Sequence, residues 1–222
     1  MSLKYELSHL NEDGTQSGSV QQDEALLLYA MVKVLHPRTI VEFGFAGGYS
    51  AHNFLSAMPD DCRLFSFDPS DKALQASRAI EDHRFQFLHK PGEAVMYEDI
   101  GENLVDFVFI DASHDFDSNV AIFQKIKDWL ALECLIIIHD TGLYNTDFMQ
   151  GNIWDIPGSY LVGEKGYAHR PGERQFVNYL KTSCPEFDQI HFHSMNVGRM
   201  GLTALKKYQR LSVKEQAVTD GE

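Results

Sequence analysis

The sequence is poor in cysteine and has no long apolar run. Its three cysteines, Cys62, Cys134 and Cys184, are scattered without C-x-x-C spacing. An odd, unclustered set does not form a disulfide framework and is typical of a reducing compartment. The most apolar stretch, 25–35, contains Lys33 and is too short to span a bilayer. These absences predict a cytoplasmic protein without a membrane partner.

Basic residues are also scarce. The chain has 19 Lys+Arg against 32 Asp+Glu, which gives a formal net charge of -13. A polyanion would be repelled on approach, and no run of lysines or arginines offsets that repulsion. We therefore expect no nucleic acid as a partner and interpret most of the excess acid as solvated surface. A small molecule is the expected partner, and a homo-oligomer stays open.

Of the 222 residues, 44% are apolar and 23% are charged, and both fractions are typical of soluble globular proteins. Length and composition therefore indicate one ordinary folded domain. A polar arm is expected over residues 1–18, the domain over 19–207 and a tail over 208–222. Residues 142–171 contain five glycines, two prolines and several aromatics but no clear period. An irregular segment of that length is typical of a functional element, and we interpret it as a mobile lid insert.

Short apolar runs alternate with longer helical patterns along the domain. This alternation predicts an α/β fold in which parallel strands are linked by crossover helices. The expected strands are Thr39–Phe43, Leu64–Phe67, Phe85–Leu88, Val105–Ile110, Leu135–His139, Gln189–His193 and Leu202–Lys206. The first expected helix has a capping box at Ser19 and Gln22 and an apolar run from Ala25 to about Leu35. The other expected helices are Ser50–Ala57, Asp71–Ala79, Asn119–Leu130 and Glu173–Thr182. A turn with Asn196 and Gly198 makes the last two strands an antiparallel hairpin at the sheet edge.

The most specific motif is a glycine-rich turn between the first strand and the next helix. It reads Thr39-Ile40-Val41-Glu42-Phe43-Gly44-Phe45-Ala46-Gly47-Gly48-Tyr49-Ser50. Glycines let backbone amides approach a ligand, and a helix N-terminus favours negative charge. The dinucleotide pattern G-x-G-x-x-G is absent because Ala46 takes its second glycine position. The turn predicts a ligand site, with a purely structural turn as the alternative.

Acidic side chains follow three of the expected strands. Asp68 ends the second strand, where a carboxylate can accept both hydroxyls of a ribose. Asp111 ends the fourth strand and Asp140 follows the fifth, so both should reach the edge that holds the glycine turn. Two such carboxylates suit Mg²⁺, which fills its remaining positions with water and substrate.

With these residues in place, the chain resembles a class I S-adenosylmethionine-dependent methyltransferase. Gly18-Ser19-Val20 with Glu42–Ser50 resembles the catechol O-methyltransferase-like group. Phe109–Phe116 and Ile136–Thr141 resemble the macrocin O-methyltransferase and cephalosporin hydroxylase-like branch. The resemblance covers roughly residues 18–141. It implies a Rossmann-like, doubly wound sheet of seven mostly parallel strands with one antiparallel strand and helices on both faces.

The resemblance also implies residue roles for S-adenosylmethionine. The implied cofactor-binding residues are Glu42, Gly44, Gly48, Ser50, Asp68, Glu93 and Asp111. Among these, Glu42, Gly44 and Gly48 would hold the methionine and backbone part, Asp68 the ribose, and Glu93 the adenine pocket.

The resemblance implies metal ligands at Asp111 and Asp140, and His139 is a candidate third ligand. His139 stands where relatives more often carry an acid, and Thr141 where the catechol type carries Asn. A histidine-containing set leaves Mn²⁺, Zn²⁺, Fe²⁺ or an empty site open beside Mg²⁺. His114 matches the general base of some sugar O-methyltransferases, and an imidazole suits proton removal near neutral pH.

The resulting hypothesis is transfer of a methyl group from S-adenosylmethionine to a small-molecule hydroxyl, assisted by a divalent metal. Two alternatives stay open. One is a nicotinamide-dependent oxidoreductase, which Ala46 disfavours. The other is a cofactor-binding protein whose acceptor site has decayed, which His139 and the absence of a Gly-Gly turn at 132–134 allow.

Overall fold

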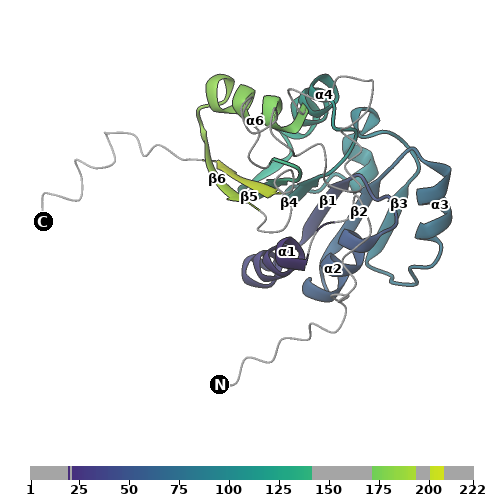
Figure 1. The fold of residues 1–222 in the computed structure, drawn as a ribbon. Coiled ribbons are helices and arrows are strands. Elements are labelled where there is room, and N and C mark those ends of the chain that lie inside the picture. The colour runs from purple at the N-terminus through teal and green to yellow at the C-terminus, as the bar shows by residue number, and fades with distance from the viewer. Residues whose placement is uncertain (1–19, 21, 142–171, 194–200, 208–222) are drawn as a thin grey trace, which may run out of the picture.

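The chain folds around one seven-stranded sheet with helices on both faces (Figure 1). The computed structural model describes residues 20, 22–141, 172–193 and 201–207. The strands are β1 (Thr39–Phe43), β2 (Arg63–Phe67), β3 (Phe85–Leu88), β4 (Val105–Ile110), β5 (Leu130–Ile138), β6 (Phe187–His193) and β7 (Gly201–Lys207). The helices are α1 (Gln22–Leu35), α2 (Tyr49–Ala57), α3 (Asp71–Ser77), α4 (Phe116–Ile126) and α6 (Gly172–Ser183), with 3-10 turns η1 (Gly92–Ala94) and η2 (Tyr97–Ile100).

The strand order is β3-β2-β1-β4-β5-β7-β6. Strands β1 to β5 pair in parallel, whereas β7 pairs antiparallel with both β5 and β6. The predicted seven-stranded sheet with one antiparallel strand is therefore confirmed. The order reverses between β1 and β4, and a doubly wound sheet opens a crevice for ligands at such a point.

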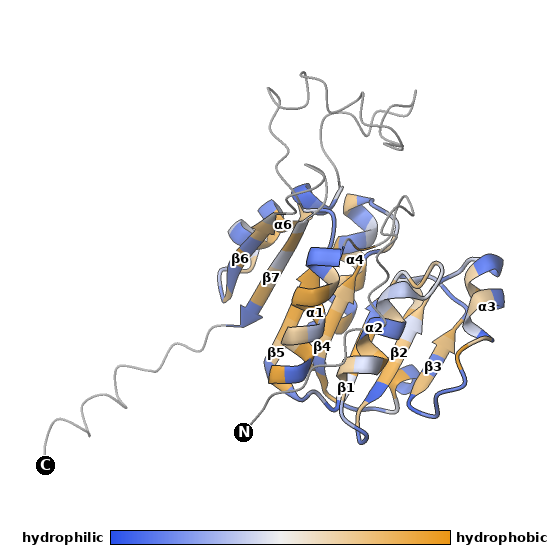
Figure 2. Cartoon of the chain, turned by 60° about the horizontal axis from the view of Figure 1, so that its bottom comes forward, coloured by the Kyte–Doolittle hydropathy of each residue, from blue (hydrophilic) through white to orange (hydrophobic). Residues whose placement is uncertain are grey.

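Alternate side chains of the central strands enter two separate cores. Ile40, Phe107 and Ile137 pack with residues of α1 and α2 on one face. Val41 and Val108 pack with residues of α4 and α6 on the other. Because both faces are covered, the strands are apolar along most of their length, as the hydropathy colouring in Figure 2 shows.

The predicted helix Asn119–Leu130 was wrong at both ends. Helix α4 begins earlier because the Asp115 carboxylate caps it by accepting from the Ser118 amide at 2.9 Å. It ends at Ile126, and Leu130 instead opens β5, where it pairs with Val105. Leu130 lay at helical spacing from earlier apolar residues, so periodicity alone could not separate the two structures.

Smaller differences occur at other boundaries. Helix α1 is described from Gln22, the third residue after the predicted cap Ser19, and α3 ends at Ser77 rather than Ala79. The expected arm, lid insert, hairpin turn and tail (1–18, 142–171, the turn with Asn196 and Gly198, and 208–222) lie outside the described residues. The domain boundaries and the lid remain predictions.

The three cysteines are free and buried in different places. Cys62 lies in the core beneath α1 and α2, whereas Cys134 and Cys184 lie in the core beneath α4 and α6. Burial raises the pKa of the Cys62 thiol to about 12 and also raises the pKa of the other two thiols. Within the described part of the chain, no helix is long and apolar enough to cross a membrane.

Candidate functional site

The predicted glycine turn lies against the end of β4, at the reversal of strand order. The Asp111 amide donates to the Phe43 carbonyl at 2.8 Å, and the Gly44 amide donates to the Phe67 carbonyl at 2.9 Å. Gly44 has φ 97°, and a Cβ there would stand 1.8 Å from the Asp111 carbonyl oxygen. Only glycine fits this contact. The turn and Asp111 are thereby held side by side.

The Asp68 carboxylate lies directly against this turn. Its Oδ2 accepts from the backbone amides of Phe45 at 3.1 Å and Ala46 at 2.9 Å, and its Oδ1 accepts from Ser70 at 2.8 Å. Ala46 has a positive φ of 47°, which non-glycine residues adopt uncommonly and often at ligand sites. Asp68 thus stabilises the turn, and its predicted contact with a ribose would add to that structural role.

Glu42 lies beneath the turn, fully buried. Its carboxylate accepts from the Ser50 hydroxyl at 2.5 Å and from the Ser66 hydroxyl. Burial raises the pKa of Glu42 to about 7, although the two serine hydrogen bonds act in the opposite direction. The structure brings two predicted cofactor residues, Glu42 and Ser50, into contact, and their contact with a cofactor remains a prediction.

Glu93 lies in η1, beside the first turn of α4. Its carboxylate accepts from the Ser118 hydroxyl. At the neighbouring Gly92 a Cβ would meet Ile122 at 2.7 Å and Phe43 at 2.8 Å, so close packing explains why a glycine stands there. Close packing also explains Gly48, because a Cβ there would lie 2.6 Å from the Phe45 ring. The adenine role of Glu93 stays a prediction.

The three predicted metal residues converge. One ligand atom from each of Asp111, His139 and Asp140 can be chosen so that all lie within 4.8 Å of one another. His139 Nδ1 is 3.1 Å from Asp111 Oδ1 and 3.5 Å from Asp140 Oδ1. Two carboxylates and one imidazole form a donor set that fits a divalent transition metal. Asp140 adopts a positive φ of 58°, which is unusual outside glycine.

His114 stands on the other side of Asp140. Its Nδ1 lies 2.5 Å from Glu173 Oε1 and 3.4 Å from Asp140 Oδ2. Burial lowers the pKa of His114, but the hydrogen bond and negative charge of Glu173, together with Asp140, raise it above the usual value. For His139, burial is likewise outweighed by the charges of Asp111 and Asp140, and its pKa lies well above the usual value.

Two glutamates of this site were not predicted. Glu173, in the first turn of α6, contacts His114, and Glu24, in the first turn of α1, contacts His139 through Oε2 at 3.0 Å. Both are buried. The cluster therefore sets four carboxylates, from Glu24, Asp111, Asp140 and Glu173, against two imidazoles.

Thr141, where the catechol type carries Asn, is turned toward β7. Its hydroxyl accepts from Thr203 Oγ1 at 2.7 Å, and its amide donates to the Gly201 carbonyl at 3.1 Å. The side chain is fully buried. Thr141 thus joins the end of β5 to β7 and does not belong to the group of three convergent metal-type side chains.

Comparison with known proteins finds methyltransferases. A family model described as a methyltransferase domain matches residues 41–141. A candidate caffeoyl-CoA O-methyltransferase of Arabidopsis thaliana is 28% identical over 128 residues, covering 55% of this chain and 54% of that protein. A flavonoid 3',5'-methyltransferase of Vitis vinifera is 26% identical over 106 residues, covering 44% and 45%. The chain thus aligns with about half the length of these curated relatives.

Among solved structures, the O-methyltransferase TomG of Streptomyces achromogenes, in complex with S-adenosylmethionine, superposes with a TM-score of 0.65. The two chains are 18% identical, and the superposition covers 92% of this chain and 91% of TomG. At that identity the likeness concerns the fold. The matched residues run from β1 to just past the end of β5 and contain the glycine turn with Asp111 and Asp140, whereas Glu24 and Glu173 lie outside them. Residues 41–141 of this chain thus match a methyltransferase domain, and the fold is shared with an O-methyltransferase of solved structure.

Proposed function

We propose that this protein transfers the methyl group of S-adenosylmethionine to a hydroxyl of a small-molecule acceptor. One observation carries the proposal: the glycine turn after β1 touches Asp111, which also belongs to the carboxylate–histidine cluster. The first element suits a nucleoside cofactor, and the second suits activation of an oxygen nucleophile. The relatives named for caffeoyl-CoA and flavonoids support a phenolic acceptor.

We assign the cofactor to the turn and the strand ends around it. The Asp68 carboxylate would accept hydrogen bonds from the ribose hydroxyls of the cofactor. Gly44 would allow the backbone to approach the methionine part of the cofactor. The remaining assigned positions are Glu42, Gly48, Ser50, Glu93 and Asp111. The contacts between Asp68 and the turn amides support this assignment because they fix the turn before a ligand binds.

The reaction forms a bond between the acceptor oxygen and the methyl carbon, while the bond from that carbon to the sulfonium sulfur breaks. The hydroxyl proton must then leave. We assign it to His114, with Glu173 accepting the Nδ1–H so that Nε2 takes the acceptor's proton. The buried Glu173 would also stabilise the imidazolium that forms.

Asp111, His139 and Asp140 would hold a divalent ion, which when bound would lower the pKa of a chelated acceptor hydroxyl. The convergence of their donor atoms supports this part of the proposal. A cytoplasmic location is also proposed, and three free cysteines in one chain support it.

The test begins with cofactor binding. Ligand at about 100 times its Kd adds about 2.7 kcal/mol to stability, so S-adenosylmethionine should raise the Tm by roughly 5–10 °C. NAD should leave the Tm unchanged, and Asp68→Ala should weaken S-adenosylmethionine binding measured by calorimetry. Stabilisation by NAD alone would instead favour an oxidoreductase.

Turnover decides between an enzyme and a decayed acceptor site. Transfer of a labelled methyl group should be measured with caffeoyl-CoA and with a flavonoid that carries adjacent hydroxyls. EDTA should abolish transfer and leave cofactor binding intact, and added Mn²⁺ or Mg²⁺ should restore it. Transfer at full rate in excess EDTA would remove the metal from the proposal. Cofactor binding without transfer to any phenolic acceptor would contradict the proposed activity.

A further inference from the structure

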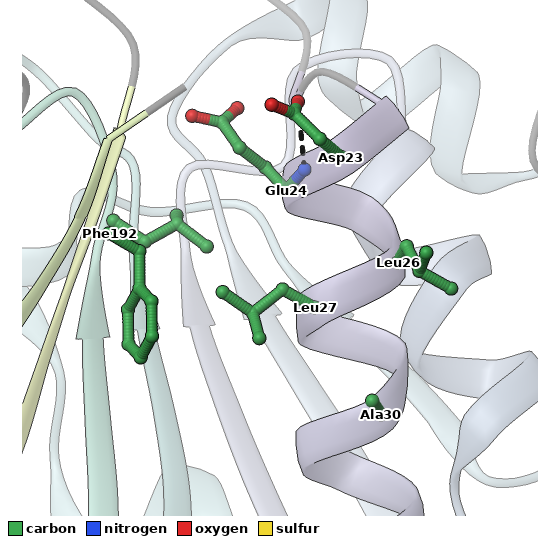
Figure 3. A pocket seen from close by; sticks show the side chains of 7 residues that line it. Asp23, Glu24, Leu26, Leu27, Ala30 and Phe192 are labelled. Carbon is green, nitrogen blue, oxygen red and sulfur yellow. Dashed lines mark hydrogen bonds between the residues drawn. The ribbon is translucent and has the colours of Figure 1, made fainter. Parts of the chain in front are cut away.

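Glu24 is a buried acid whose burial the local structure of α1 does not explain. Its side chain is only 4% exposed, whereas its neighbour Asp23 is exposed in the same turn. Figure 3 shows the two carboxylates side by side at the start of the helix, where α1 faces Phe192 of β6. A buried carboxylate is costly unless it is paired and hydrogen-bonded, so its partner is informative.

That partner is His139, which lies 115 residues further along the chain. Glu24 Oε2 is 3.0 Å from His139 Nε2, and His139 is 1% exposed. The other ring nitrogen, Nδ1, faces Asp111 and Asp140 at 3.1 and 3.5 Å, without the alignment of a hydrogen bond. The imidazole thus stands between one glutamate and the predicted metal residues.

We propose that Glu24 is a positioning residue, which accepts the Nε2–H of His139 and thereby turns the Nδ1 lone pair toward Asp111 and Asp140. The inference rests on the proposed function, of which it deepens the metal part. A histidine that ligates a metal usually donates its other N–H to a carboxylate or carbonyl, which fixes the tautomer and the ring orientation. Glu24 supplies such a carboxylate from a helix that contributes no ligand itself.

The consequence concerns metal choice. With Nδ1 available, the site has one nitrogen and two carboxylate donors, and imidazole favours Mn²⁺, Fe²⁺ or Zn²⁺ relative to Mg²⁺. Without Glu24, the same imidazole could donate from Nδ1 to the aspartates and block the site. The glutamate on α1 would therefore decide whether His139 serves as a ligand or as a donor.

The test measures Mn²⁺ binding to the full chain by electron paramagnetic resonance. Glu24→Ala should weaken Mn²⁺ binding about 10–100-fold, the usual effect of losing such an outer partner. Glu24→Gln should weaken it less, because the amide oxygen can still accept from Nε2. The matched control is Asp23→Asn, which removes a charge from the same helical turn and should leave Mn²⁺ affinity unchanged.

A second measurement reads the tautomer directly. Nitrogen-15 NMR of the metal-free protein, assigned with His139→Gln, should show Nε2 protonated and Nδ1 unprotonated at a pH where the ring is neutral. Glu24→Ala should change this pattern, and S-adenosylmethionine affinity should stay the same in all variants. If a variant fails to fold, the tautomer of His139 in the parent protein still tests the role of Glu24.

The possible failures can be told apart. Equal Mn²⁺ affinity in the parent and Glu24→Ala, or an Nδ1–H tautomer in the parent, would overturn the role of Glu24 and leave the proposed methyl transfer standing. Absence of Mn²⁺ binding in the parent would overturn both this inference and the metal part of the function. Methyl transfer itself is judged separately, by turnover.

Discussion

At the scale of single residues, the two unpredicted glutamates left a signal in the sequence. Glu173 precedes Phe176, Val177 and Leu180 at the spacing i+3, i+4 and i+7, and all four are buried. Glu24 likewise stands four residues before Leu28 on the buried side of α1. Each acid therefore begins the apolar stripe of its helix. A charge aligned with such a stripe indicates a buried partner, although the sequence does not name it.

The three aspartates could be predicted more readily than the two helix glutamates because the aspartates lie at strand ends. Asp68, Asp111 and Asp140 each follow a recognisable apolar run, and parallel strands bring their carboxyl ends to one edge. The pairing of Glu24 with His139 and of Glu173 with His114 depends instead on how helices pack, at sequence separations of 115 and 59. No local pattern encodes such distances.

Glu42 allows a prediction about pH. The pKa of Glu42 rises from 4.5 to about 7 on folding, so between these values the folded state holds a proton that the unfolded chain has lost. The free energy of unfolding should therefore fall as pH rises through this window, by roughly 3 kcal/mol from this residue. Glu42→Gln, which cannot ionise, should lack that decline in urea unfolding at about pH 5 and about pH 8.

The control for this measurement is Glu98→Gln, at an exposed position in η2. It should keep the decline of the parent. Parallel pH profiles for Glu42→Gln and the parent would show that the buried carboxylate is not held protonated as its surroundings suggest.

At the scale of elements, the bounds of two central strands were predicted closely, whereas helix ends and the start of β5 were not. Strands β1 and β4 have the expected bounds because both of their faces are covered, which produces short continuous apolar runs. The start of α4 depended on the side-chain cap from Asp115, and the start of β5 on pairing with Val105. Caps and cross-strand pairs are three-dimensional contacts that periodicity does not report.

The start of α6 gives an element-scale prediction. Alanine usually stabilises a helix relative to glycine, yet a Cβ at Gly172 would lie 2.4 Å from the His114 carbonyl oxygen. Gly172→Ala should therefore lower the free energy of unfolding by about 1–3 kcal/mol, the usual cost of overpacking. Asn178→Ala, exposed on the same helix, should change it by less than about 0.5 kcal/mol.

A displaced α6 should also disturb the pair that it carries. In Gly172→Ala the NMR signals of His114 should shift, whereas those of His139, which α1 supports, should stay in place. Unchanged stability together with unchanged His114 signals would mean that the first turn of α6 accommodates the added Cβ without loss of unfolding free energy.

At the scale of the whole molecule, the labelling rates of the buried cysteines would report how often the fold opens. A thiol reagent attacks the thiolate, and here each thiol is both covered and raised in pKa. Cys62 lies beneath one sheet face and Cys134 beneath the other, so labelling of both should require the same global opening.

Cys184 should report a different event. It is 8% exposed, against 0% for Cys62 and 1% for Cys134, and it follows α6 near the edge strand β6. Mass spectrometry of a labelling time course should therefore find Cys184 modified first, with Cys62 and Cys134 following together. Equal rates at all three would mean that the β6 edge never opens alone. A ligand at the β1–β4 crevice should slow the labelling of Cys62 and Cys134 by the factor 1 + [L]/Kd and leave the early Cys184 phase unchanged.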